Sequence, residues 1–170
     1  MAVLPIKTYP DPILSRACRQ VEVVDDDLRH LAADMLETMY AAPGVGLAAP
    51  QVGSDLRLVV VDCSERDQDP APLILVNPRI VQAEGSLVFE EGCLSVPDYT
   101  CEVTRASRVV VQALDDQGRP IRVEGEGLMA VCLQHELDHL EGRLFIDRIS
   151  PLKRSLYKKR RAKQLKRDQA

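Results

Sequence analysis

Residues 134 to 139 of this 170-residue sequence carry its clearest indication of chemistry. They read Gln-His-Glu-Leu-Asp-His, which places His135 and His139 four positions apart with Glu136 beside the first. On a helix such side chains share one face, with about 5 to 6 Å between their Cβ atoms. Two imidazoles at that spacing can hold one metal ion while the glutamate acts as a general base. The pattern also arises by chance, but two of only three histidines in the chain occur here.

A catalytic metal site of this kind needs a third protein ligand and an open position for water. A metzincin would carry its third histidine at the position of Phe145, so that class is excluded. A thermolysin-type site needs a downstream acid, but Asp147 is too close and Asp168 lies in a basic tail. We therefore expect an upstream ligand, and the best candidate is Cys93, which follows a glycine and can bind as a thiolate. The alternative is that this cysteine is a small apolar core residue.

A glycine-rich segment, Gly44 to Gln51, is the third candidate for a functional role. Glycines allow the backbone to approach a ligand closely, and the amide of Gln51 can donate to a developing oxyanion. The alternative is an ordinary turn between a helix and a strand. A phosphate-binding loop is excluded, because the required Lys-Ser/Thr pair is missing.

The predicted secondary structure would place these residues on a small α+β scaffold. Apolar residues recur every three or four positions after the acids at Asp25 to Asp27, which predicts a helix that ends near the Pro43-Gly44 turn. Leu128 to Leu140 is apolar nearly all round and ends before Gly142, which predicts a central buried helix carrying the HExxH pattern. Short apolar runs predict strands at Leu56–Val61, Leu73–Val76, Arg108–Leu114 and Pro120–Glu124, the last two forming a hairpin.

The expected fold class is therefore α+β, with antiparallel strands packed around that central helix and a further helix at the C-terminus. A chain of this length can bury a core without help from a metal or disulfides, so any metal site is expected to be functional. The five cysteines (Cys18, Cys63, Cys93, Cys101 and Cys132) are odd in number and form no CxxC pair, which argues against a disulfide framework. No apolar run approaches the roughly 20 residues of a membrane span, and residues 1 to 7 resemble no export signal, so we expect a cytoplasmic protein.

Charge divides the chain into two parts. The net charge of −4 combines −12 over the first 152 residues with +8 over residues 153 to 170. We expect one domain over residues 1–150 and a basic helical extension of it over 151–170. The tail is either a solubilising end or a segment that docks on polyanions such as RNA.

Three motifs taken together resemble the signature motifs of bacterial peptide deformylase: GVGLAAPQ at 44–51, EGCLSVP at 91–97 and QHELDHLEG at 134–142. The resemblance implies a metal-dependent hydrolase that removes the formyl group from the N-terminal formylmethionine of nascent polypeptides and releases formate. It implies the following roles: Cys93, His135 and His139 as metal ligands; Glu136 as the acid/base; Gln51 and the Leu94 backbone N–H as oxyanion donors; Val45, Phe89, Leu128, Val131 and Cys132 as the methionine pocket; Gly46 beside the substrate backbone; and Glu91 supporting a ligand histidine. Thr100 stands where some members carry an arginine near the substrate.

Two histidines and a thiolate suit several divalent ions. Similar bacterial enzymes use iron, so we expect Fe²⁺ in the cell, with Zn²⁺, Ni²⁺ or Co²⁺ possible in preparations. The expected partners are formylmethionyl nascent peptides and, through the basic tail, the ribosome near its exit tunnel, as in similar proteins. No membrane partner is expected.

Two other readings compete with this one. The first is a metallopeptidase of another HExxH class, which the lack of a suitable downstream ligand disfavours. The second is a non-catalytic, metal-stabilised module that binds the ribosome. Glu136 argues against the second, because a structural site has no use for a base beside an open coordination position.

Overall fold

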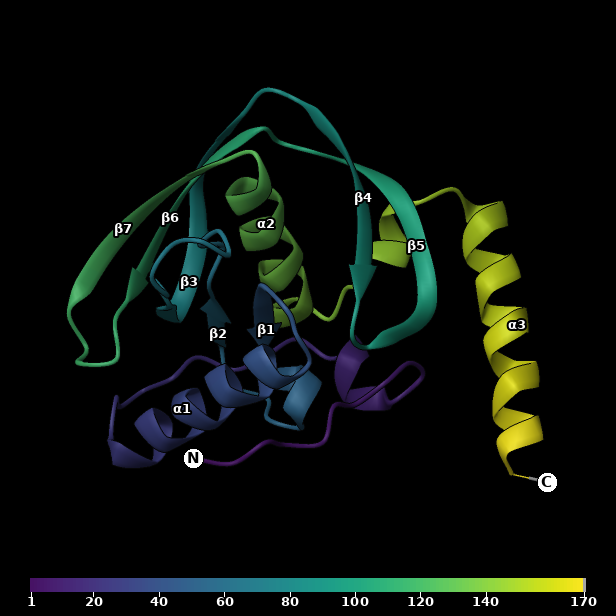
Figure 1. The fold of residues 1–170 in the computed structure, drawn as a ribbon, viewed down its shortest axis with the longest axis horizontal. Helices are drawn as coiled ribbons and strands as arrows, with labels where there is room; N and C mark the ends of the chain where they lie inside the picture. The colour runs from purple at the N-terminus through teal and green to yellow at the C-terminus, as the bar shows by residue number, and fades with distance from the viewer. Residues whose placement is uncertain (170) are drawn as a thin grey trace.

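A computed structural model describes residues 1–169 and shows an α+β fold built on antiparallel sheets (Figure 1). One sheet has five strands in the order β1-β2-β3-β6-β7, and the second is a hairpin of β4 and β5. The strands are β1 Gly46–Ala48, β2 Leu58–Val61, β3 Leu73–Glu84, β4 Leu87–Cys93, β5 Val96–Arg105, β6 Arg108–Leu114 and β7 Pro120–Glu126. The helices are α1 Asp26–Ala41, α2 Leu128–Leu140 and α3 Pro151–Asp168, with 3₁₀ turns η1 Pro12–Ser15, η2 Ala49–Val52 and η3 Phe145–Arg148. The expected α+β class is confirmed.

Helix α1 covers one side of the five-stranded sheet. Its N-cap is Asp25, whose side chain accepts a hydrogen bond from the Leu28 backbone N–H at 2.9 Å, as the cluster of acids predicted. Its buried face includes Leu28, Met35 and Met39, which belong to one apolar cluster with Leu58 of β2. Because β1 and β2 lie directly above this face, α1 fixes the start of the glycine-rich segment (Figure 1).

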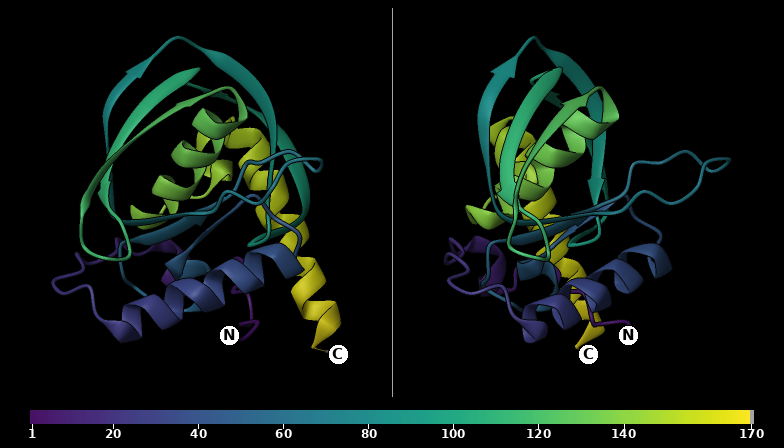
Figure 2. Two further views of the ribbon diagram at one scale, coloured as in Figure 1. Left: turned by 60° about the vertical axis from the view of Figure 1, so that its left-hand side comes forward. Right: turned by 90° about the vertical axis from the view of Figure 1, so that its left-hand side faces the viewer.

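Helix α2 runs between the five-stranded sheet and the β4–β5 hairpin, as the views in Figures 1 and 2 agree. Its bounds, Leu128–Leu140, match those expected from the sequence. Every residue from 130 to 140 except Gln134 is buried, and the helix contacts β1, β2, β6 and β7. It ends at Leu140, and the turn that follows contains Gly142, whose φ of +75° favours glycine. A Cβ there would also lie 2.8 Å from the Ser15 backbone, so this turn requires glycine on two counts.

The sequence patterns missed the strands nearest to the site. Neither β1 nor the β4–β5 hairpin was expected, and β3 extends eight residues beyond Val76 to Glu84. Two of these segments lack a buried apolar face that would produce a pattern: most of β4 and all of β3 from Arg79 onward are exposed. Strand β1 is buried but only three residues long, and the inward residues of β5 include Cys101 and Arg105 rather than a run of aliphatic side chains. They are strands because neighbouring chain pairs with them, β5 with β4 and β6 with β3.

Helix α3 begins at Pro151, where the basic extension was expected, after the N-cap Ser150. One face of it packs on the body of the protein. The ring of Tyr157 is 2% exposed and lies 4.9 Å from that of Tyr99, while Arg161 Nε donates to the Tyr9 carbonyl at 3.0 Å. Most of its other residues are exposed. Within residues 1–169, no helix combines the length and the hydropathy that a membrane crossing requires.

Candidate active site

Three side chains from two elements converge at the end of β4. Cys93 is the last residue of β4, and His135 and His139 lie one turn apart on α2. One ligand atom of each lies within 4.8 Å of the others, and Cys93 Sγ is 3.4 Å from His139 Nε2. Tetrahedral coordination at ordinary metal–sulfur and metal–nitrogen lengths separates two such atoms by about 3.6 Å. The donor set and its spacing therefore fit a divalent metal ion.

The two histidines differ in their surroundings. Burial and the neighbouring His135 lower the pKa of His139 well below its usual value, so it is held as the neutral imidazole that binds metals. His135 Nδ1 lies 2.9 Å from Glu91 Oε1, which leaves its Nε2 free for a metal. Burial opposes protonation of His135, yet hydrogen bonds to Cys93 and Glu91 raise its pKa. A divalent cation bound between the two side chains would replace the His135 proton as the partner of the Cys93 sulfur.

Glu136 is placed to move protons beside this cluster. Glu136 is 4% exposed and lines a cavity that opens onto the cluster. Within residues 1–169, its Oε2 atom has no hydrogen-bond partner. Burial raises the pKa of this carboxyl to about 7. A carboxyl group with that pKa can both take and return a proton near neutral pH.

Gln51 lies on η2, just after the glycine-rich strand β1. Its Oε1 accepts a hydrogen bond from the Ala48 backbone N–H at 3.0 Å, so the orientation of the amide is fixed. The amide nitrogen then faces Ser95 Oγ at 3.1 Å and Cys93 Sγ at 3.6 Å. A donor that is held before the reaction can stabilise a developing oxyanion without reorganising.

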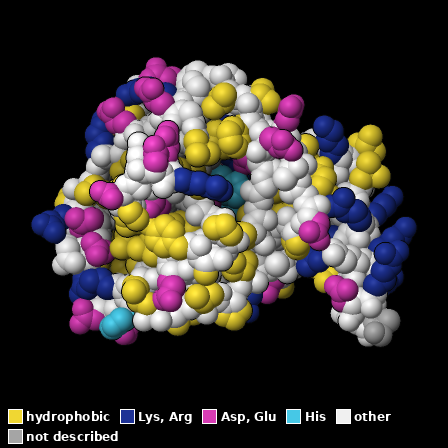
Figure 3. Space-filling model, viewed as in Figure 1, with side chains coloured by type: hydrophobic (Ala, Val, Ile, Leu, Met, Phe, Trp, Pro, Cys, Tyr) yellow, Lys and Arg dark blue, Asp and Glu magenta, His cyan; other side chains and the backbone are white. Residues whose placement is uncertain are grey.

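A cavity of about 610 Å³ opens onto the cluster, and Figure 3 shows a histidine in a hollow with hydrophobic side chains above it and a basic side chain beside it. It is lined by residues that the resemblance assigned to the site: Val45, Gly46, Gln51, Phe89, Glu91, Cys93, Leu94, Leu128, Val131, Cys132, His135 and Glu136. His139 is the exception, because it is fully buried behind the cavity wall. Thr100 also lines the cavity, and its hydroxyl donates to Glu90 Oε1 at 2.9 Å.

Gly46 sits where β1 passes closest to α2. A Cβ at this position would lie 2.8 Å from both Cys132 Sγ and Glu136 Oε1. The absence of a side chain is therefore what allows the strand to lie against the helix at Glu136. The glycine-rich segment is thus a close-contact strand rather than an ordinary turn.

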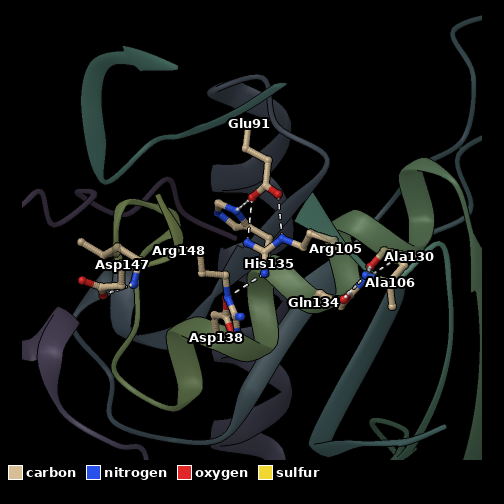
Figure 4. Close-up of polar contacts among 10 residues, drawn as sticks. Glu91, Arg105, Ala106, Ala130, Gln134, His135, Asp138, Asp147 and Arg148 are labelled. Carbon is tan, nitrogen blue, oxygen red and sulfur yellow. Dashed lines mark hydrogen bonds and ion pairs between the residues drawn. The ribbon is translucent and has the colours of Figure 1, made fainter. Parts of the chain in front are cut away.

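Of the buried charged groups behind the cysteine–histidine cluster, the resemblance anticipated only Glu91 beside a histidine, and sequence reasoning missed Arg105 and Asp138. Arg105 donates to both oxygens of Glu91, at 2.6 and 2.8 Å, and to Asp138 Oδ2 at 2.8 Å (Figure 4). Burial alone would raise the pKa of Glu91, but hydrogen bonds from Arg105 and His135 lower it, so this carboxylate stays charged. Asp138 gave the one available signal, since an acid on a largely apolar helix needs a cation. Nothing local in the sequence identified which arginine.

Comparisons with a family model, with curated sequences and with solved structures all point to the same family. Residues 3–155 match the model of a family described as polypeptide deformylase. The chain is 51% identical over 166 residues to a peptide deformylase of Syntrophobacter fumaroxidans, covering 98% of each chain. It is 53% identical over 171 residues to one of Mesorhizobium japonicum, covering 100% of this chain and 97% of the relative.

Two solved structures extend the likeness to three dimensions. A peptide deformylase from Legionella pneumophila is 48% identical with a TM-score of 0.89, covering 99% of this chain and 98% of the other. One from Ehrlichia chaffeensis, in complex with actinonin, is 40% identical with a TM-score of 0.91, covering 96% and 98%. The likeness therefore covers nearly the whole chain, in sequence and in fold.

Proposed function

The chain belongs to the polypeptide deformylase family and removes the N-formyl group of nascent polypeptides; from this premise we propose how its residues do so. Cys93, His135 and His139 are the metal ligands, Glu136 is the acid/base, and Gln51 with the Leu94 backbone N–H stabilises the oxyanion. One observation carries the proposal: the cysteine–histidine cluster, the unpartnered carboxylate oxygen and the oriented amide all meet beside a single cavity.

The residues act in a defined order. A divalent ion held by Cys93, His135 and His139 would supply Lewis-acid activation, lowering the pKa of water towards about 7 and polarising the formyl carbonyl. Glu136 takes the proton of the attacking water and then gives it to the departing amine. Gln51 Nε2 donates to the oxygen that becomes negative as the formyl carbon turns tetrahedral, and the Leu94 N–H donates alongside it. Collapse of that species releases formate and a free N-terminus.

The cavity accounts for the side chain at the first position. Val45, Phe89, Leu128 and Val131 supply apolar walls, and Cys132 adds a small, polarisable side chain. Walls of this kind suit an unbranched, thioether-sized side chain such as that of methionine. Gly46 leaves room for the substrate backbone along β1, and Glu91 holds His135 in its ligand orientation.

We propose iron(II) as the ion used in the cell, with zinc, nickel or cobalt able to replace it. Two imidazoles and a thiolate accept all four, so the donor set supports the proposal without selecting among them. A thiolate beside iron is open to oxidation in air. Metal analysis after anaerobic purification, followed by activity during aeration, tests this: iron-loaded protein should lose activity in air faster than nickel-loaded protein. Equal decay would contradict the proposal.

We also propose that residues 1–150 form the catalytic domain and that residues 151–170 form a basic extension of it, which docks on the ribosome in the cytoplasm. Two observations support the proposal: Tyr157 and Arg161 hold α3 on the body, and the basic side chains gather on the outward side (Figure 3). A basic helix beside an acidic body suits the phosphates of ribosomal RNA.

Product analysis separates deformylation from the peptidase alternative. The chain is loaded with nickel and incubated with formyl-Met-Ala-Ser and with the same peptide carrying an acetyl group. Mass spectrometry should show loss of the formyl group alone, with the acetyl peptide left unchanged. Cleavage between internal residues would support a peptidase instead.

A further inference from the structure

Five side chains, beginning with the proposed ligand His135, form a continuous chain of hydrogen bonds and ion pairs behind the cysteine–histidine site (Figure 4). At one end His135 Nδ1 contacts Glu91, which Arg105 holds by two hydrogen bonds. Arg105 then reaches Asp138 at 2.8 Å. At the other end Arg148 holds Asp138 by two hydrogen bonds, Nε to Oδ2 at 2.5 Å and NH2 to Oδ1 at 2.6 Å.

With His135 neutral, as a histidine that binds a metal must be, the charges of the other four side chains sum to zero only if Arg148 is included. The side chains of Glu91 and Arg105 are 3% and 2% exposed, and that of Asp138 is 11% exposed. Without Arg148, one buried guanidinium would face two buried carboxylates. An uncompensated buried charge is costly, so the two carboxylates would then compete for the Arg105 guanidinium.

That competition would reach the metal ligand. Asp138 already takes one donor of Arg105 while Glu91 takes two. If Asp138 lost its other partner, it would draw the guanidinium away from Glu91. Glu91 would then hold the Nδ1 side of His135 less rigidly, and the opposite nitrogen would no longer be fixed for coordination.

A second contact ties the same short element to the same histidine. Arg148 is the last residue of η3, and Phe145 at its start stacks on the His135 ring with centroids 6.2 Å apart. The element therefore reaches His135 at its ring face through Phe145 and at its Nδ1 through the ion pairs. Arg148 itself lies outside the cavity lining and its side chain is 38% exposed, so it does not meet the substrate.

We propose that Arg148 is a positioning residue for the metal centre, which fixes His135 through Asp138, Arg105 and Glu91. This inference rests on the proposed ligand set and adds a residue three side chains removed from the ligand. Residues that support metal ligands typically change metal affinity or activity by about 10- to 100-fold when substituted. At this distance we expect an effect at the lower end, about tenfold.

The test uses the full chain loaded with cobalt(II), whose visible absorption reports ligand geometry. Arg148→Ala and Arg148→Lys are compared with Arg143→Ala, which removes the same charge from the same connection between α2 and α3. Arg143 is exposed and makes no side-chain ion pair within the described part of the chain. The two readouts are the cobalt spectrum and the rate of metal release to a chelator.

We expect Arg148→Ala to shift the cobalt bands and release metal about tenfold faster, with Arg143→Ala unchanged. Arg148→Lys keeps the charge but not the paired hydrogen bonds, and should fall between them. If the alanine variant fails to fold, the lysine variant decides by the same readouts. Lower thermal stability with an unchanged spectrum and release rate would show a purely structural role and overturn the proposal. A parent protein that binds no cobalt would instead overturn the ligand set on which the inference rests.

Discussion

Cys93 Sγ lies 3.4 Å from His139 Nε2, although 46 residues separate the two in the sequence. The contact exists because the β4–β5 hairpin folds over α2 (Figure 1). The last residue of β4 therefore lies beside the second histidine of the HExxH pattern. Each element contributes an incomplete ligand set, and their packing completes it. With the proposed ligand set, folding of this hairpin is a condition for metal binding.

Metal content should depend on Cys93 and on no other cysteine. Cys93→Ala removes the thiolate of the cluster, so bound metal measured by emission spectrometry after gel filtration should fall close to zero. The matched controls are Cys18→Ser, Cys63→Ser and Cys101→Ser, at positions outside the cluster. Full metal occupancy in Cys93→Ala would refute the assignment of the third ligand.

Glu136→Gln should keep the metal and lose turnover. The amide preserves the volume of the side chain but cannot accept the proton of water, and general acid–base help is typically worth about 10²- to 10⁴-fold. The measurement is kcat alongside metal content for the same preparation. Retained activity at normal metal content would mean that another group acts as the base.

Gly46→Ala should damage the site, whereas Gly44→Ala should not. The added Cβ at residue 46 would lie 2.8 Å from Cys132 Sγ and Glu136 Oε1, while at residue 44 the nearest atoms lie 3.6 Å away. Overpacking of this kind typically costs about 1 to 3 kcal/mol of stability. We expect a lower melting temperature and a reduced kcat only in the first variant. Similar behaviour of the two variants would remove close strand–helix contact as the reason for glycine.

Selectivity at the first residue should follow the apolar walls of the cavity. A missing methylene in such a pocket costs about 1 to 3 kcal/mol, so formyl-norleucine peptides should replace formyl-methionine peptides well and formyl-alanine peptides poorly. The comparison is kcat/KM for three peptides that differ only at that residue. Equal values for alanine and methionine would exclude this cavity as the side-chain pocket.

The basic side chains of α3 can be tested without removing the helix, because truncation would also strip away the buried Tyr157. Changing the exposed residues Lys159, Lys163 and Lys166 to Glu should abolish co-sedimentation with ribosomes at low salt. Hydrolysis of a short formylated peptide should be unaffected. For the parent protein, log affinity should fall as log salt rises, with a slope of about −0.7 to −0.9 per phosphate neutralised.

The matched control places the same charge change on the body. Arg16, Arg66 and Arg143 are exposed, and their joint replacement by Glu alters the net charge equally. This control should still sediment with ribosomes. If the α3 variant also sediments normally, the helix is only a solvated end of the domain.

The spacing of apolar and capping residues in the sequence predicted the helices of this protein well, but it did not predict the ion pairs. The bounds of α2 followed from an apolar run with a glycine at its end, and Asp25 capped α1 as expected. The β4–β5 hairpin was missed because burial does not follow residue type there: Val88 and Phe89 of β4 are exposed, whereas Glu91 and Arg105 are buried. The partners of Asp138 were missed for a related reason: Arg105 and Arg148 reach it from β5 and from η3, and sequence periodicity carries no information on such contacts.

Formate release is the measurement that tests the central claim most directly. The chain is loaded anaerobically with iron(II) and given a formylmethionyl peptide, and formate is measured together with the free amines that appear. We predict equal amounts of the two products from the parent protein and neither from Cys93→Ala. Parent protein with verified metal that releases no formate, or a Cys93→Ala variant that releases it at the parental rate, would contradict the account.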